Sequence, residues 1–75
     1  MQPVEVKGFL ESQLPDTRGE VAGEGCNFEL KLYNDELYGL SPVKRQQRVY
    51  ALLNPWILDG TIHAVSMSFF ASEPA

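Results

Sequence analysis

The sequence predicts a single α+β domain whose elements follow the order α-β-β-α-α-β and form a three-stranded mixed sheet with helices packed on one face. Two patterns lead to this class. Apolar residues recur every three or four positions in some segments, which is typical of amphipathic helices, and alternate with polar residues in others, which is typical of half-buried strands. The length of 75 residues allows one domain, over residues 1–75, with a thin hydrophobic core.

The first helix is predicted over residues 4–13. Pro3 suits the first turn, where its missing N–H costs no hydrogen bond. Pro15 and Asp16 end the helix, because the residue before a proline avoids the α conformation. The apolar positions with helical spacing are Val6, Phe9, Leu10 and Leu14.

A β-hairpin is predicted next, with strands over residues 18–22 and 27–33. The second strand alternates apolar and polar side chains, so one of its faces is expected to be buried. The apolar set is Phe28, Leu30 and Leu32, and the other set is Glu29, Lys31 and Tyr33. The connecting segment GEGC, at residues 23–26, contains two glycines that can supply the positive φ angles of a tight turn.

The second half of the chain is predicted as a connector over residues 37–40, a helix over 43–54 and a separate helical turn over 55–58. Ser41 and Pro42 form a typical helix start, and Pro55 is expected to interrupt the helix after Asn54. The predicted apolar stripe is Val49, Leu52, Leu53 and Trp56.

The last strand is predicted over residues 62–70, after a break at Asp59 and Gly60. Its apolar residues Val65, Met67 and Phe69 alternate with small ones. Because a helical crossover joins parallel neighbours, this strand should lie parallel to the second strand. Residues 71–75 are predicted to be a frayed tail.

Composition predicts a globular protein that stays in the cytoplasm and has no membrane partner. A hydrophobic fraction of 44% is too high for a disordered tail, and no apolar run approaches the roughly 20 residues of a membrane-spanning helix. The N-terminal segment lacks the basic and apolar regions of a secretory signal. Cys26 is the single cysteine, which excludes an internal disulfide and a four-cysteine metal site built from this chain alone.

The residues do not predict an enzyme. The sequence has no P-loop, no G-x-G-x-x-G motif and no pair of carboxylates on a shared face. Asp16, Asp35 and Asp59 all fall at predicted turns, where capping explains them. A Cys26–His63 dyad would also need a third group to orient the imidazole, and the spacing suggests none.

Two residues nevertheless carry metal-binding chemistry. His63 shares its parity with Val65, which favours a core histidine, although its place at the start of a strand favours exposure. Cys26 could be a small buried side chain, or an exposed thiol in a glycine-rich loop that serves as a ligand or redox group. The residues alone leave both alternatives open.

A third candidate is the basic cluster Lys44, Arg45 and Arg48, predicted on the solvent side of the second helix. Such a cluster is most simply a solvated helix face, and otherwise a docking surface for an acidic partner or a phosphate. The net charge of −4 disfavours a protein that acts mainly on a nucleic-acid backbone.

Three segments together resemble the BolA-like proteins, and most closely their bacterial IbaG branch. These are SPVKRQQRVY at residues 41–50, GTIHAVS at residues 60–66 and the loop GEGCNF at residues 23–28. The resemblance covers nearly the whole chain. It implies a fold like a class II KH domain, which agrees with the element order predicted above.

The resemblance also implies a cofactor and a partner. BolA-like proteins share a [2Fe-2S] cluster with a monothiol glutaredoxin and glutathione, and the cluster is absent from the isolated apo protein. The family's histidine ligand corresponds to His63, and its second ligand, a histidine or cysteine in the hairpin loop, corresponds to Cys26. Members often continue with a C-terminal helix, whereas this sequence ends at Ala75 without one.

The expected function is therefore that of a non-enzymatic glutaredoxin partner in iron–sulfur trafficking or sensing, with the free protein a monomer or weak homodimer. The alternative is a DNA-binding transcriptional regulator that uses Lys44, Arg45 and Arg48. Against it, the sequence lacks the Gly-x-x-Gly loop with which KH domains hold a backbone. A third hypothesis is a stress-related interaction module without a cofactor.

Overall fold

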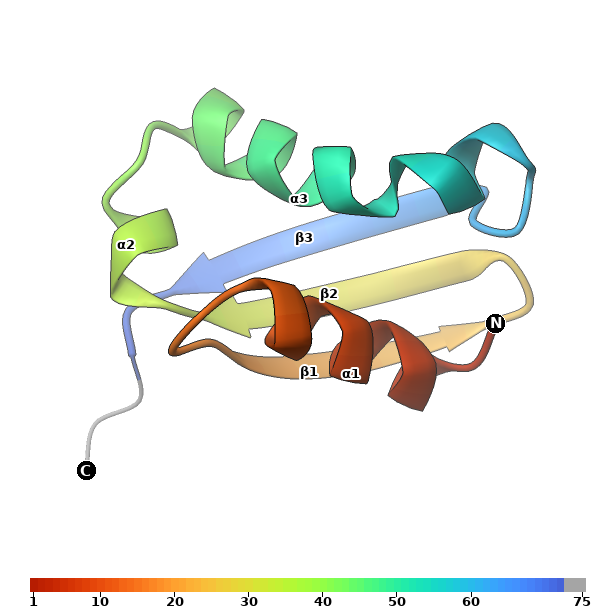
Figure 1. Cartoon of the computed structure of the whole chain (residues 1–75), viewed down its shortest axis with the longest axis horizontal. Helices are drawn as coiled ribbons and strands as arrows, with labels where there is room; N and C mark the ends of the chain where they lie inside the picture. The colour runs from red at the N-terminus through yellow and green to blue at the C-terminus, as the bar shows by residue number, and fades with distance from the viewer. Residues whose placement is uncertain (73–75) are drawn as a thin grey trace.

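The structure is a computed structural model that describes residues 1–72. The elements follow the predicted order α-β-β-α-α-β (Figure 1). They are α1 (Pro3–Gln13), β1 (Arg18–Glu24), β2 (Asn27–Tyr33), α2 (Asp35–Tyr38), α3 (Pro42–Leu58) and β3 (Ala64–Phe70).

The sheet has the predicted mixed topology. Its strand order is β1-β2-β3, with β1 antiparallel and β3 parallel to the central strand β2. The helices α1 and α3 lie on the same side of the sheet, as Figure 1 shows. On the opposite face, the outward side chains of β2 are exposed except for the half-buried Tyr33. The α+β class, the mixed sheet and the one-sided helical cover are thus confirmed.

The core lies between β2 and the two long helices. The inward side chains of β2 are at most 4% exposed, whereas those of β3 are only half-buried because β3 is an edge strand. Phe9 of α1 meets Trp56 of α3 edge to face, with 4.8 Å between the ring centroids. The core cluster consists of Val6, Leu10, Phe28, Leu30, Leu32, Val49, Leu53 and Ile62.

The helices between β2 and β3 differ from the prediction. Residues 37–40 are not simply a connector, because α2 covers Asp35–Tyr38. The Asn34 side chain caps this helix by accepting a hydrogen bond from the Leu37 N–H at 2.8 Å, and Leu37 is buried. A capped four-residue helix with one buried residue is too short to show a helical period.

The second correction concerns Pro55, which lies inside α3 instead of separating two helices. Proline removes one N–H from the ladder of a helix. Here the carbonyl left without that partner belongs to Ala51, which is exposed and can be hydrated. The next turn is held in place because Trp56 and Ile57 pack against the core.

The chain after β3 is held at one point. The N–H and the hydroxyl of Ser72 both donate to the Asp35 carboxylate, at 2.8 and 2.7 Å. These bonds hold the pKa of Asp35 below its ordinary value. Residues 73–75 lie outside the described residues, so the frayed tail predicted over 71–75 stays a prediction there.

Candidate functional site

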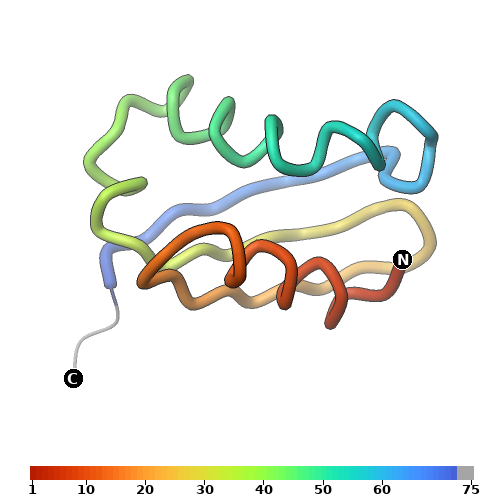
Figure 2. The backbone as a smooth tube through the Cα atoms, in the orientation of Figure 1, coloured from red at the N-terminus to blue at the C-terminus, as the bar shows by residue number. Residues whose placement is uncertain are grey.

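The two predicted metal ligands meet at one end of the sheet. Figure 2 shows the β1–β2 turn and the segment that leads into β3 side by side. The His63 N–H donates to the Cys26 carbonyl oxygen at 2.7 Å, and the Ala64 N–H approaches the same oxygen at 3.2 Å. The backbones of Cys26 and His63 are therefore in direct contact, although the residues are far apart in sequence.

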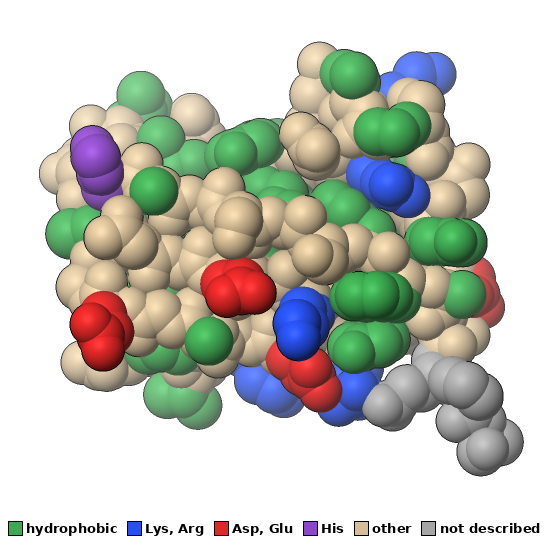
Figure 3. Space-filling model, turned by 180° about the vertical axis from the view of Figure 1, so that it is seen from behind, with side chains coloured by type: hydrophobic (Ala, Val, Ile, Leu, Met, Phe, Trp, Pro, Cys, Tyr) green, Lys and Arg blue, Asp and Glu red, His purple; other side chains and the backbone are tan. Residues whose placement is uncertain are grey.

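Both side chains at this end are exposed. Of the two alternatives for each residue, the structure excludes the buried histidine and the buried cysteine. Figure 3 shows the chain's single histidine, coloured purple, at the surface of the molecule.

The hairpin is tighter than predicted. Strand β1 extends to Glu24, which pairs with Asn27, so the turn consists of Gly25 and Cys26 alone. Gly25 has φ of 61°, and among residues 1–72 Asp16 is the only non-glycine residue with a positive φ. A positive φ at the first turn position only is the pattern of a type II′ hairpin turn.

Gly23 lies inside β1 for a steric reason. A Cβ at this position would collide with the Asn27 carbonyl oxygen and come within 3.0 Å of the Phe28 Cα. The two strands thus approach closely just before the turn, and this fixes the path of the chain into Cys26.

The segment before His63 is also well fixed. The buried Ile62 donates its N–H to the Trp56 carbonyl at 2.9 Å. Asp59 accepts from the Thr61 N–H at 2.9 Å, and hydrogen bonds from the Thr61 side chain and backbone lower the pKa of Asp59. The turn predicted at Asp59 and Gly60 is thus confirmed, with the Asp59 side chain accepting from the backbone two residues on.

The donor set suits iron but is incomplete. Imidazole nitrogen and thiolate sulfur are both iron ligands in iron–sulfur proteins. Within residues 1–72, no group of three or more histidine, cysteine, aspartate or glutamate side chains is placed to hold a metal ion. Cys26 and His63 could therefore supply two ligands, and the others would have to come from another molecule.

A shallow hollow begins next to the two candidate ligands, between β2 and β3. It is lined by Asn27, Phe28, Glu29, Ala64, Val65 and Ser66. Asn27 follows Cys26 and Ala64 follows His63, so the hollow adjoins the site. The small outward-facing residues Ala64 and Ser66 make room here, and no pattern in the sequence marks them as part of a site.

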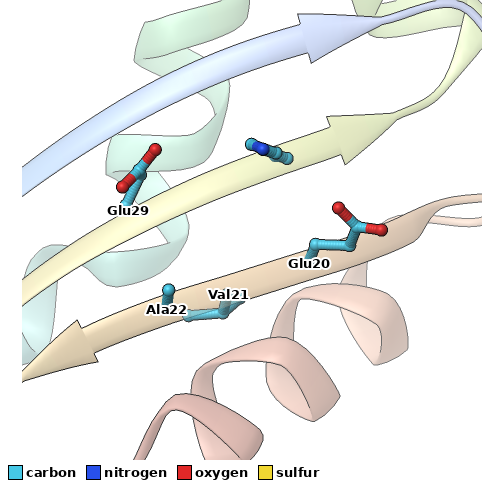
Figure 4. A pocket seen from close by; sticks show the side chains of 5 residues that line it. Glu20, Val21, Ala22 and Glu29 are labelled. Carbon is cyan, nitrogen blue, oxygen red and sulfur yellow. The ribbon is translucent and has the colours of Figure 1, made fainter.

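A second hollow lies on the open sheet face, between β1 and β2 (Figure 4). Glu20 and Glu29 project from these strands beside Lys31. Two carboxylates around one amine make this surface unsuitable for a phosphate backbone.

The predicted basic cluster is only partly on the solvent side, which corrects the prediction for Arg45. The Arg45 guanidinium lies 5.1 Å from the centre of the Phe69 ring and donates to the Tyr38 carbonyl at 3.4 Å. Lys44 and Arg48 are exposed, and Arg48 approaches the Glu36 carboxylate at 3.8 Å. Arg45 is drawn inward because α2, which the sequence did not predict, offers it the carbonyl and the aromatic ring of Tyr38.

The fold and the contact between Cys26 and His63 at the end of the sheet define a small α+β protein with an exposed histidine beside the hairpin loop. The chain belongs to the BolA-like protein family, whose family model matches residues 1–73. Within residues 1–72, no helix is both long and apolar enough to cross a membrane.

Relatives place the chain near the IbaG branch of this family. It is 34% identical over 70 residues to the acid stress protein IbaG of Escherichia coli, with 93% of this chain and 83% of the relative covered. It is also 34% identical over 73 residues to a protein of Acinetobacter guillouiae from the rpoN–murA intergenic region, covering 97% and 88% of the two chains.

Solved structures share the fold. A BolA homologue from Coxiella burnetii has a TM-score of 0.78 at 24% identity, covering 95% of this chain and 91% of that chain. BolA1 from Arabidopsis thaliana has a TM-score of 0.73 at 24% identity, covering 96% and 95% of the two chains.

Proposed function

We propose that this protein is a non-enzymatic partner of a monothiol glutaredoxin and shares a [2Fe-2S] cluster with it for iron–sulfur trafficking or sensing. One observation carries the proposal: the His63 N–H bonds the Cys26 carbonyl at 2.7 Å while both side chains are exposed. An imidazole and a thiol at one exposed corner can reach a metal centre held by a second molecule.

The chain's own residues would act as ligands and as their supports. His63 would bind iron through a neutral ring nitrogen, and Cys26 would bind it as a thiolate. The hydrogen bond from the Ile62 N–H to Trp56 and the type II′ turn at Gly25 hold the two ligands in place. A cluster with an imidazole ligand has a higher reduction potential than one held by thiolates alone.

Several features support a binding role over an enzymatic one. The two hollows on the sheet face are open and shallow, which suits contact with another molecule better than enclosure of a substrate. Since the Escherichia coli relative is an acid stress protein, we place the proposed role in the stress response. A single free cysteine also fits the reducing cytoplasm.

DNA binding is the weaker alternative. Of its three basic residues, Arg45 packs against Phe69 and Arg48 approaches Glu36, which leaves the helix with little free positive charge. The carboxylates of Glu20 and Glu29 on the open sheet face add repulsion.

The test is anaerobic cluster reconstitution with a monothiol glutaredoxin and glutathione, read by visible circular dichroism and size exclusion. The wild-type protein is expected to form a 1:1 complex whose spectrum differs from that of the glutaredoxin homodimer. His63→Ala and Cys26→Ser should each alter or abolish it, whereas Asn27→Ala, at an exposed residue next to Cys26, should not. Failure of the folded wild-type protein to form a complex would contradict the proposal.

A further inference from the structure

The outer edge of β3 carries unused hydrogen-bonding groups. The Ala64 N–H bonds Cys26 and the Phe70 carbonyl accepts from the Asn34 N–H, so the even-numbered residues of β3 direct their backbone groups toward β2. Because backbone direction alternates along a strand, Val65, Met67 and Phe69 direct theirs away from the sheet. Within residues 1–72, no strand pairs with β3 on that side.

The two edges of the sheet differ in charge. The edge strand β1 carries Arg18, Glu20 and Glu24 among its seven residues. Charged side chains of this kind protect an edge strand against pairing with other chains. Strand β3, with the sequence AVSMSFF, has no charge, no proline and no glycine. Its edge thus lacks the usual protection.

Helix α3 adds apolar surface above this edge. In Figure 1, α3 runs alongside β3 on the side away from β2. Val43, Tyr50 and Ile57 are spaced by seven residues and therefore lie on one line along the helix. At about 100° per residue, this line is roughly 120° around the axis from Trp56. Trp56 contacts Phe9 of α1, and the fully buried Leu53 lies between Trp56 and this line around the axis, so the line is on the side of α3 away from α1, toward the β3 edge.

Two of these three helical residues are exposed although they are apolar. Val43 is 64% and Tyr50 is 41% exposed, and Ile57 is half-buried. The inward side chains of β3 next to them are also only half-buried. We call these residues together the edge strip: Val43, Tyr50, Ile57, Val65, Met67 and Phe69.

We propose that the edge strip binds an extended segment of a partner protein, which adds a fourth strand to the sheet beside β3. The partner segment would pair its backbone with Val65, Met67 and Phe69. Its side chains would alternate, with uncharged apolar residues under α3 and polar residues on the open sheet face. An uncharged apolar face is the complement of the uncharged strand β3 and of the apolar α3 line, with the Arg45 guanidinium stacked on Phe69 at one end of the strip.

A second copy of this chain does not fit the same place. An antiparallel β3–β3 pair around a two-fold axis would put both α3 helices on the same side of the joined sheet. Paired strands lie about 4.8 Å apart, whereas packed helices need about 8–10 Å between axes. Since each α3 lies toward the outer side of its β3, the helices would collide. A bare strand without a covering helix avoids this clash.

The test uses the apo protein and a random dodecapeptide library, with selection on immobilised protein. Selected peptides should alternate apolar and polar residues. In amide exchange followed by NMR, they should slow the N–H groups of Val65, Met67 and Phe69. N-methylation of alternate peptide bonds on the pairing edge should abolish binding, because it removes the backbone donors.

A matched pair of variants locates the site. Tyr50→Lys places a charge in the edge strip and should weaken peptide binding by about tenfold or more. Ala51→Lys places the same charge on the neighbouring exposed residue, outside the strip, and should leave binding unchanged. The double variant His63→Ala, Cys26→Ser should also bind normally, so this test and the cluster test can fail independently.

Four results would overturn the proposal. The selection could yield no alternating peptides, or the peptides could bind equally to the two lysine variants. A single-stranded DNA oligonucleotide could protect the same three amides more strongly than any peptide. Finally, the wild-type protein could dimerise through this edge, with the dimer lost in Tyr50→Lys.

Discussion

Asn34 joins three parts of the fold, and its removal should be costly. It is a buried residue, 6% exposed, at the end of β2. Its side-chain amide donates to the Pro15 carbonyl at 3.0 Å and to the Thr17 hydroxyl at 2.6 Å, and its side-chain oxygen accepts from the Leu37 N–H at 2.8 Å. One side chain thus ties the α1–β1 loop to the start of α2.

Asn34→Ala should lower the free energy of unfolding by about 3 kcal/mol, since each of the lost hydrogen bonds contributes about 1 kcal/mol. The alanine would leave the Pro15 carbonyl and the Leu37 N–H without their partner. A domain of this size has a total stability of roughly 4–11 kcal/mol, so the loss is a large share.

The assay is urea denaturation followed by circular dichroism, which gives the free energy of unfolding and its urea dependence. Thr17→Val is the matched control, because it removes only the hydroxyl, which accepts from Asn34 at 2.6 Å and donates weakly to the Pro15 carbonyl at 3.3 Å, and it should cost about 1–2 kcal/mol. A loss below about 1 kcal/mol for Asn34→Ala, with the urea dependence unchanged, would refute the role given to this residue.

Other predictions follow from single side chains. The pKa of Glu11 is lowered, first by the hydrogen bond from the Gly19 N–H and then by the one from Lys7. The ionised carboxylate therefore stabilises the fold at pH values above 4.5, its ordinary pKa, and this contribution is lost as the pH falls through the lowered pKa. Glu11→Gln should therefore flatten the loss of stability in acid; an unchanged pH profile of the unfolding free energy would contradict this. Gly8→Ala, at an exposed helical position with open space around it, should raise the unfolding free energy by about 1 kcal/mol in urea denaturation. A decrease in the unfolding free energy would contradict the open space around Gly8. Leu53→Ala should lower it by about 2–5 kcal/mol because a fully buried side chain is lost, whereas Leu58→Ala, 77% exposed, should change it by less than about 0.5 kcal/mol.

The fold could be predicted from the sequence wherever a periodic pattern was long enough to define a face. The β2 alternation of Phe28, Leu30 and Leu32 and the α3 stripe of Val49 and Leu53 are examples. The two errors, at α2 and at Pro55, occurred where a side-chain cap or a tertiary contact determines the structure and no periodic pattern reveals it. α2 depends on the Asn34 cap, and α3 continues through Pro55 because packing beyond the proline holds the last turn.

The site could be predicted only as two separate residues. The sequence identifies Cys26 and His63 by their chemistry, but it contains no local signal that puts them together. Their contact results from the parallel register of β2 and β3, in which Asn27 pairs with Ala64. Arg45 shows the opposite case, since its sequence position suggests a solvent-facing charge and the contact with Phe69 appears only in three dimensions.

The most direct measurement of the central claim uses the fact that the chain contains a single histidine, His63. This chain would be labelled with ¹⁵N-histidine, combined with an unlabelled monothiol glutaredoxin, glutathione and a reconstituted cluster, and then reduced. Pulsed electron paramagnetic resonance of the reduced complex would be compared with a sample made from unlabelled protein. A strong ¹⁵N hyperfine coupling that appears only with the labelled chain is the predicted result. A 1:1 complex that contains the cluster but lacks this coupling would contradict His63 as a ligand.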